Sequence, residues 1–127
     1  MREIKFRIFD KKIGKIFKAH DLRFTAEEAV YEVCHDTITD TGVKHRTFTD
    51  FKEIVLMQFT GLKDIEGKEI YEGDVISGYN NPHVVTFTDG AYYLTYKNSS
   101  TRLSRTCGTL KIIGNIYENP ELKQTTS

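Results

Sequence analysis

Three carboxylates stand within six residues in the middle of the chain, and they are the first group whose spacing suggests chemistry. Glu69, Glu72 and Asp74 lie in the segment EIYEGD, and clustered carboxylate oxygens are the ligands that Ca²⁺ prefers. Their spacing does not match the ligand positions of an EF-hand loop. The glycine beside them is more typical of a solvent-exposed turn. We therefore expect no cation site here.

The cysteines and histidines give no stronger signal for metal or nucleophilic chemistry. The residues to consider are Cys34, His35, His45 and Cys107, which form no C-x-x-C and no H-x-x-x-H pair. A Ser/His/Asp or Cys/His group depends on proximity in space, which a sequence does not show. We expect no catalytic residue, no metal and no cofactor, and we predict that the protein is not an enzyme.

Basic residues beside aromatic ones offer the best case for a ligand. Gly90 to Tyr117 contains no Asp or Glu, and three tyrosines come before its basic residues Lys97, Arg102, Arg105 and Lys111. Such a mixture suits phosphate contact and base stacking. Four charges are few, however, and the pI is near 6.9. Nucleic-acid binding is therefore the alternative prediction, with these four residues as the candidate contacts.

The composition is that of a folded domain with an uneven charge distribution. The 127 residues are 39% hydrophobic and 12% aromatic, with a formal net charge of zero. Residues 1–23 and 90–127 are basic, whereas residues 24–89 are acidic. No apolar run approaches a membrane span, and the first residues lack a signal peptide's apolar core. We expect one domain over residues 1–122, no membrane contact and a cytoplasmic location.

The first half of the chain predicts a hairpin and a helix. Ile4, Phe6 and Ile8 alternate with other residues as in a strand with one buried face, and Ile13, Ile16 and Phe17 suggest its returning partner. Thr25 with Glu28 resembles a capping box, and apolar residues then recur at helical spacing. We predict one short α-helix over Ala26–Cys34, followed by an exposed connection, or a weak hairpin, over His35–Asp50.

The second half reads as short strands between turns. Apolar and β-branched residues predict strands at residues 53–60, 83–88, 91–96 and 109–117. Asp89-Gly90 suits a two-residue type I′ hairpin turn, Gly114 a bulge, and Lys97–Gly108 a polar loop. Gly73 suits a tight reversal, and the Asp74 carboxylate can accept backbone N–H groups there. The pattern predicts a mainly β fold, a small barrel or strongly bent sheet.

Three blocks of this chain resemble the YopX family of phage and prophage proteins. They are MREIKFRIFD at the start, MQFTGLKDIEGKEIYEGDVI in the middle and IIGNIYENPEL near the end. The resemblance implies a small SH3-like β-barrel with an N-terminal β-hairpin. It would place the hairpin, helix and connection in residues 1–52, the barrel strands in 53–122, and a frayed tail in 123–127.

The resemblance carries over no catalytic residue. The positions that match the family blocks are motif residues of unknown role: Thr60, Gly61, Leu62, Asp64, Gly67, Tyr71, Gly73, Asp74, Gly114, Asn115, Tyr117, Asn119 and Pro120. It implies an accessory protein in the bacterial host cell. We expect a non-enzymatic module for protein interaction or assembly, whose partner is another protein or a second copy of the chain. The Lys97–Gly108 loop and the Leu62–Glu72 turn are the surfaces predicted to make contact.

Overall fold

The chain forms two compact units, each with its own strands. The computed structural model describes residues 3–24, 30–38, 44–77, 81–104 and 110–124. The first unit is Lys5–Met57, called here the N-terminal unit. The second, the C-terminal unit, comprises the chain from Gln58 onward together with the residues before Lys5. Nearly all regular structure in the described residues is β-strand, so the predicted mainly β class is confirmed.

The N-terminal unit is a meander of antiparallel strands. Its elements are β1 (Phe6–Asp10), β2 (Lys15–Phe24), β3 (Val30–Ile38), β4 (Lys44–Asp50), a 3₁₀ turn η1 (Phe51–Glu53) and the start of β5 (Ile54–Lys63). The strand order is β4-β3-β2-β1-β5. Buried Ile8 and Ile54 form its described core, with Phe17 packed against them. The pairing of β1 with β2 confirms the predicted hairpin.

The predicted helix is wrong over Val30–Cys34, where the chain is the strand β3. This strand pairs on one side with β2 and on the other with β4. Valine, tyrosine and threonine are better strand than helix residues, and two neighbouring strands satisfy the backbone of β3. The rest of the predicted helix, residues 26–29, lies outside the described residues. The weak hairpin proposed within residues 35–50 is present as β3–β4, so these residues are not a simple connection.

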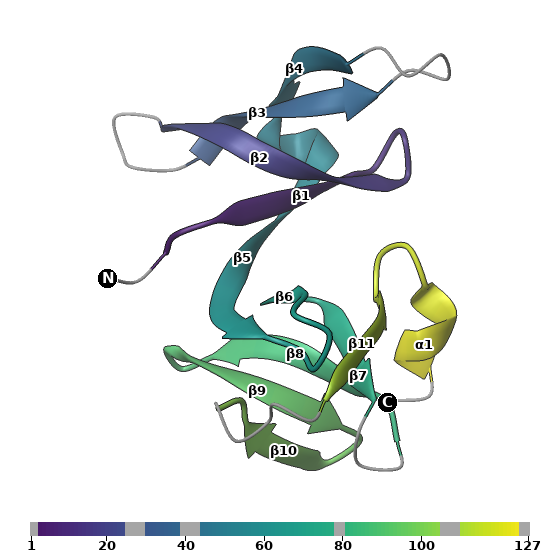
Figure 1. The fold of residues 1–127 in the computed structure, drawn as a ribbon. Helices are drawn as coiled ribbons and strands as arrows, with labels where there is room; N and C mark the ends of the chain where they lie inside the picture. Colours follow the sequence, from purple (N-terminus) through teal and green to yellow (C-terminus); the bar gives the residue numbers. More distant parts are fainter. Residues whose placement is uncertain (1–2, 25–29, 39–43, 78–80, 105–109, 125–127) are drawn as a thin grey trace. The chain divides into compact units, whose positions relative to one another are not determined.

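The C-terminal unit is a curled five-stranded antiparallel sheet (Figure 1). Its elements are the end of β5, then β6 (Glu69–Tyr71), β7 (Asp74–Ser77), β8 (His83–Thr88), β9 (Ala91–Tyr96), β10 (Ser99–Arg102), β11 (Lys111–Asn115) and α1 (Pro120–Gln124). The sheet order is β10-β9-β8-β7-β11, and β6 pairs with the end of β5. The buried core is formed by Ile70, Ile76, Val85, Leu94, Leu103 and Leu110.

Two predicted features of this sheet are confirmed. Asp89 and Gly90 join β8 to β9 with φ angles of 51° and 80°. Positive φ at both positions defines the type I′ turn, whose twist matches that of the flanking strands. In β11, the register with β7 shifts between Ile112 and Gly114, which is the predicted bulge.

The predicted polar loop over Lys97–Gly108 is wrong in its first part. Ser99–Arg102 forms β10, which pairs with β9 after a tight turn that holds Lys97 at a φ of 52°. The strand was not predicted because its residues are Ser, Ser, Thr and Arg, and strands were recognised from apolar residues. Residues 105–108 lie outside the described residues. The one described α-helix, α1, is at the other end of the chain from the helix predicted.

No helix in the described part of the chain is long and apolar enough to cross a membrane.

Candidate functional site

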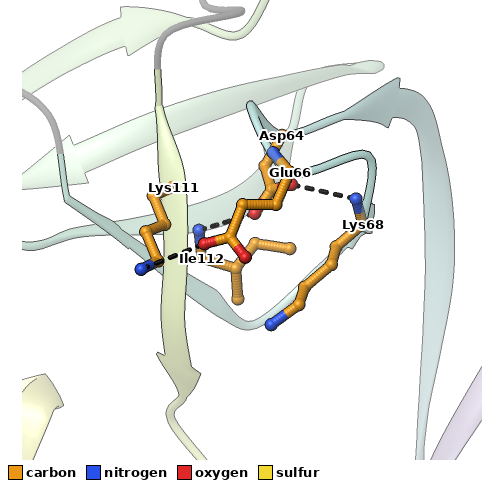
Figure 2. A network of polar contacts seen from close by, with 5 residues as sticks. All are labelled: Asp64, Glu66, Lys68, Lys111 and Ile112. Atoms are coloured by element: carbon orange, nitrogen blue, oxygen red, sulfur yellow. Dashed lines mark hydrogen bonds and ion pairs between the residues drawn. The ribbon is translucent and has the colours of Figure 1, made fainter.

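Asp64 holds the turn between β5 and β6 against β11. Its side chain is only 6% exposed. One carboxylate oxygen, Oδ1, accepts the backbone N–H groups of Glu66 and Lys68, each at 2.9 Å. The other oxygen, Oδ2, accepts the N–H of Ile112 at 3.1 Å (Figure 2). One carboxylate therefore both shapes the turn and joins it to a strand far along the chain.

These hydrogen bonds also set the acidity of Asp64. Burial disfavours its charge and by itself would raise the pKa, but the N–H groups of Ile112, Lys68 and Glu66 outweigh that effect, helped by the positive charge of Lys68. The pKa of Asp64 consequently lies below its ordinary value of 3.8. The charged carboxylate is therefore the form that the fold favours.

Lys111, a predicted contact residue, is engaged in an ion pair across the same turn. Its Nζ lies 3.0 Å from the Glu66 carboxylate, and the two side chains are 55% and 45% exposed. Figure 2 shows this pair beside the Asp64 hydrogen bonds. The hydrogen bond and charge of Glu66 raise the pKa of Lys111. Because both side chains are open to water, the pair contributes little to stability.

Two of the three carboxylates that first suggested a cation site, Asp74 and Glu72, accept backbone N–H groups, whereas the Glu69 Oε1 atom accepts the Tyr71 hydroxyl at 3.4 Å. The Asp74 Oδ2 atom accepts the N–H of Tyr71 at 2.8 Å, and the Glu72 Oε1 atom accepts the N–H of Gln58 at 3.0 Å. Gly73 lies between them with a φ of 84°. Its N–H donates to the Val85 carbonyl at 2.9 Å. This reversal thus ties β6 and β7 to neighbouring strands.

The motif residues near the C-terminus form a second turn, which is held by hydrogen bonds between its own side chains and backbone. The Asn115 Oδ1 atom accepts the N–H groups of Tyr117 at 3.0 Å and Glu118 at 2.8 Å. The Asn119 side chain in turn accepts the N–H of Asn115 at 3.3 Å. Pro120 then begins α1. The N–H groups of the first helical residues have no partner within the helix, so a proline at this position removes no helical hydrogen bond. These residues therefore connect β11 to α1.

The remaining motif positions lie at the end of β5 and in the turn after it. The Thr60 Oγ1 atom donates to the Ile70 carbonyl at 2.8 Å and accepts the N–H of Leu62 at 3.2 Å. Gly61 and Gly67 have φ angles of 90° and 82°, which favour glycine. The described hydrogen bonds thus give most of the motif an architectural role.

A groove of about 460 Å³ lies in the C-terminal unit, close to these turns but lined mainly by other residues. It is bounded by β5, the β8–β9 hairpin and the end of β10. Its lining residues are Gln58, Thr60, Leu62, Phe87, Gly90, Ala91, Tyr92, Arg102 and Leu103. We call this surface the hairpin groove. Thr60 and Leu62 are the motif residues that line it.

Two aromatic side chains, Phe87 and Tyr92, are the largest hydrophobic groups that line the hairpin groove. Phe87 lies opposite Tyr92 in the β8–β9 register, and their ring centres are 4.9 Å apart. Tyr92 and Leu62 pack against the core. Phe87, in contrast, is 51% exposed. An aromatic ring that is held in place yet half open to solvent is suited to contact with a partner.

Of the four predicted contact residues, the three that the structure describes, Lys97, Arg102 and Lys111, do not gather in one place. Arg102 borders the hairpin groove and lies opposite Tyr93 in the register, so alternation assigns its side chain to the other face from Leu103. Lys97 lies at the opposite end of β10, with Nζ 5.4 Å from the centre of the Tyr96 ring. Lys111, on β11, forms an ion pair with Glu66. Arg105 lies outside the described residues.

Sequence reasoning missed Phe87. Along residues 92–96, strand alternation places Tyr92, Leu94 and Tyr96 on one face, and Leu94 on that face is buried. The same alternation across the Asp89-Gly90 turn pairs Val85 with Leu94 and Phe87 with Tyr92. Phe87 lies two residues beyond Val85 on the same face of the strand and next to the turn, where fewer neighbours cover a side chain. This position was the signal in the sequence that could have identified it as an exposed aromatic residue.

The described residues contain no group of three or more His, Cys, Asp or Glu side chains that could hold a metal ion. Cys34 and His35 lie on β3 and His45 on β4, where the backbone but not the side chains is described. Cys107 lies outside the described residues.

These features define a small mainly β protein whose recognisable sequence motif shapes turns. The family model described as YopX protein matches residues 5–123. The chain belongs to the YopX family.

Two solved structures have a similar fold. Protein EF1440 from Enterococcus faecalis is 24% identical, with a TM-score of 0.71 over 96% of this chain and 99% of that chain. Protein yopX from Bacillus subtilis is 23% identical, with a TM-score of 0.60 over 96% of each chain. A comparison with curated proteins gives no match. At these identities the likeness concerns the fold, so the site is argued from the residues of this chain.

Proposed function

We propose that this chain is a non-enzymatic accessory protein of a phage or prophage, acting in the cytoplasm of the bacterial host by contact with another protein. In this proposal the C-terminal unit is an SH3-like barrel that serves as the scaffold. YopX-family membership supports the proposed context. The observation that carries the contact function is the hairpin groove with its half-exposed Phe87.

The chemistry of the groove favours binding over catalysis. Its lining residues bring apolar and aromatic side chains, the amide of Gln58 and the hydroxyl groups of Thr60 and Tyr92, and Arg102 lies at its border. The lining contains no carboxylate, imidazole or thiol, which are side chains that often act as general acids, bases or nucleophiles. Aromatic and guanidinium groups are instead enriched where proteins recognise partners.

Affinity capture from prophage-induced cells tests this function. Phe87→Ser should abolish recovery of a protein partner, whereas Ile13→Ser should leave recovery unchanged. Ile13 is the matched control because it is 50% exposed but lies in the N-terminal unit, between β1 and β2. Nuclease treatment of the lysate should not change the recovery of this partner by the parent chain. Equal recoveries by the parent and Phe87→Ser would contradict a contact role for the groove.

Single-stranded nucleic acid is the second candidate partner. The Phe87–Tyr92 ring pair beside Arg102 favours it, since bases stack on aromatic rings while cations attract phosphates. The Arg102→Ala, Arg105→Ala double variant addresses this alternative. Loss of a nuclease-sensitive partner, with an affinity that falls steeply as salt rises, would favour nucleic acid over protein.

A further inference from the structure

β10 presents an open sheet edge beside the hairpin groove. It is the outermost strand in the order β10-β9-β8-β7-β11, and all four of its residues are exposed. Leu103, just after it, donates its N–H to the Tyr92 carbonyl at 3.0 Å. Because inward and outward groups alternate along an antiparallel strand, the backbone N–H and C=O groups of Ser100 and Arg102 face away from β9.

These outward groups are available for another strand. Within the described part of the chain, no backbone or side-chain hydrogen bond engages Ser100 or Arg102 on that side. Exposed strand edges of this kind can bind an extended segment through main-chain hydrogen bonds, while alternate side-chain pockets supply specificity. The hairpin groove lies next to this edge, since Arg102 and Leu103 contribute to its lining.

We propose that β10 binds an extended segment of a partner protein as an added strand, and that this segment alternates apolar and acidic residues. The inference rests on the contact function proposed above, and it assigns the place and the chemistry of the contact. The segment's apolar side chains lie on the face of Tyr92 and Leu94, toward the hairpin groove. Its acidic side chains lie on the opposite face, beside Arg102.

The two faces of β10 explain this alternation. The register places Thr101 opposite Leu94 and Arg102 opposite Tyr93, so successive residues belong to opposite faces. The groove face offers Phe87, half exposed and ready to pack on an apolar side chain. The other face offers the Arg102 guanidinium, which no carboxylate of the described residues pairs with. A partner carboxylate would make a charge-assisted hydrogen bond there.

A second copy of this chain fits the edge less well than an acidic segment does. Pairing two copies of β10 would present Ser-Ser-Thr-Arg to Ser-Ser-Thr-Arg. That arrangement supplies neither a carboxylate for Arg102 nor an apolar side chain for the groove.

Synthetic peptides test the inference directly. We would use the full chain and labelled peptides of about eight residues, the usual length of a short strand. One peptide alternates Val with Glu, a second alternates Val with Lys, and a third is the Val-Glu peptide with alternate backbone nitrogens methylated. Fluorescence anisotropy should show binding of the Val-Glu peptide alone. Amide exchange at Ser100 and Arg102 should slow when it binds.

Variants of β10 separate backbone pairing from charge. Ser100→Pro removes an outward N–H at an edge position where proline is tolerated, and should weaken binding of the Val-Glu peptide about tenfold or more. Arg102→Glu should reverse the preference toward the Val-Lys peptide, which misfolding would not do. Lys12→Glu, an exposed charge reversal between β1 and β2, is the control. It should change neither the affinity for the Val-Glu peptide nor the preference for it over the Val-Lys peptide.

Distinct outcomes would overturn the inference. Equal binding of the Val-Glu and Val-Lys peptides by the parent would remove the role of Arg102. Binding that persists with the methylated peptide would remove the added strand. Binding of oligothymidine but no peptide would assign the surface to nucleic acid. A protein capture that depends on Phe87, with no peptide binding at all, would overturn this inference while leaving the proposed function in place.

Discussion

Single carboxylates explain why the middle of this sequence is so polar. Asp64, Glu72 and Asp74 accept backbone N–H groups at turns that pack onto other strands. A buried or half-buried N–H without an acceptor would cost about 1–3 kcal/mol, so each side chain stabilises the local reversal. The charge density that resembles a ligand site is therefore a consequence of how the turns are built.

Asp64→Asn should lower the free energy of unfolding by about 1–3 kcal/mol at pH 7, because the amide cannot accept the N–H groups of both the turn and Ile112. The folded pKa of Asp64 is depressed, so its contribution is present above the ordinary value of 3.8 and is lost as pH falls through the folded pKa. Urea unfolding from pH 7 to pH 2 should therefore show the two proteins converging in acid.

Glu66→Gln is the matched control for Asp64→Asn. It removes the exposed ion pair with Lys111 but leaves the Asp64 hydrogen bonds in place. We expect a much smaller loss from it, because both partners are accessible to water. A loss as large as that of Asp64→Asn would contradict the central role given to the buried carboxylate.

At the scale of elements, pairing decides what local propensity leaves open. Residues 30–34 have the apolar spacing of a helix, yet β3 is enclosed by β2 and β4. Ser99–Arg102 lacks apolar residues, yet it forms β10 because the turn at Lys97 returns it to β9. In both cases the partner strands supply what the segment's own residues do not specify.

The junction of β11 and α1 shows how closely two elements approach. A Cβ atom added at Gly114 would lie 2.6 Å from the Asn119 Oδ1 atom and 2.9 Å from the Leu122 Cδ1 atom. Gly114→Ala should therefore displace α1 and cost about 1–3 kcal/mol of stability. Thermal unfolding measures the cost, and faster amide exchange over residues 119–122 would locate it.

A double-mutant cycle provides the control for Gly114→Ala. Asn119→Ala removes the nearer obstacle, so adding Gly114→Ala in that background should cost less than it does in the parent. Equal costs in the two backgrounds would show that the Asn119 side chain is not what requires glycine at this position.

At the scale of the whole molecule, the described chain has two separate groups of buried residues. Leu94 belongs to the core of the C-terminal unit and Ile8 to that of the N-terminal unit. The prediction of one domain over residues 1–122 remains a prediction. The two compact units, each with its own core, suggest that each also opens on its own.

The variants Leu94→Ala and Ile8→Ala distinguish one cooperative domain from two units that open separately. Both side chains are at most 1% exposed, and each truncation should cost about 2–5 kcal/mol. Hydrogen exchange should show Leu94→Ala lowering protection mainly in β7–β11, and Ile8→Ala mainly in β1 and β2. A uniform loss across both units with either variant would contradict separate opening and support one cooperative domain.

The sequence by itself determined the mainly β class, the family, and the turns that depend on a few neighbouring residues. Asp89-Gly90 predicts its hairpin because positive φ is a local property of those two residues. The Asp74 side chain bonds within its own turn for the same reason.

Only the tertiary structure decided the strands β3 and β10 and the hairpin groove. These features depend on pairing and packing between segments. Phe87 is a contact candidate because Tyr92 holds its ring, while its place near the turn end of the β8–β9 hairpin leaves it half exposed. The Asp64–Ile112 hydrogen bond joins residues 48 positions apart. Folding creates such proximity, and no local pattern in the sequence encodes it.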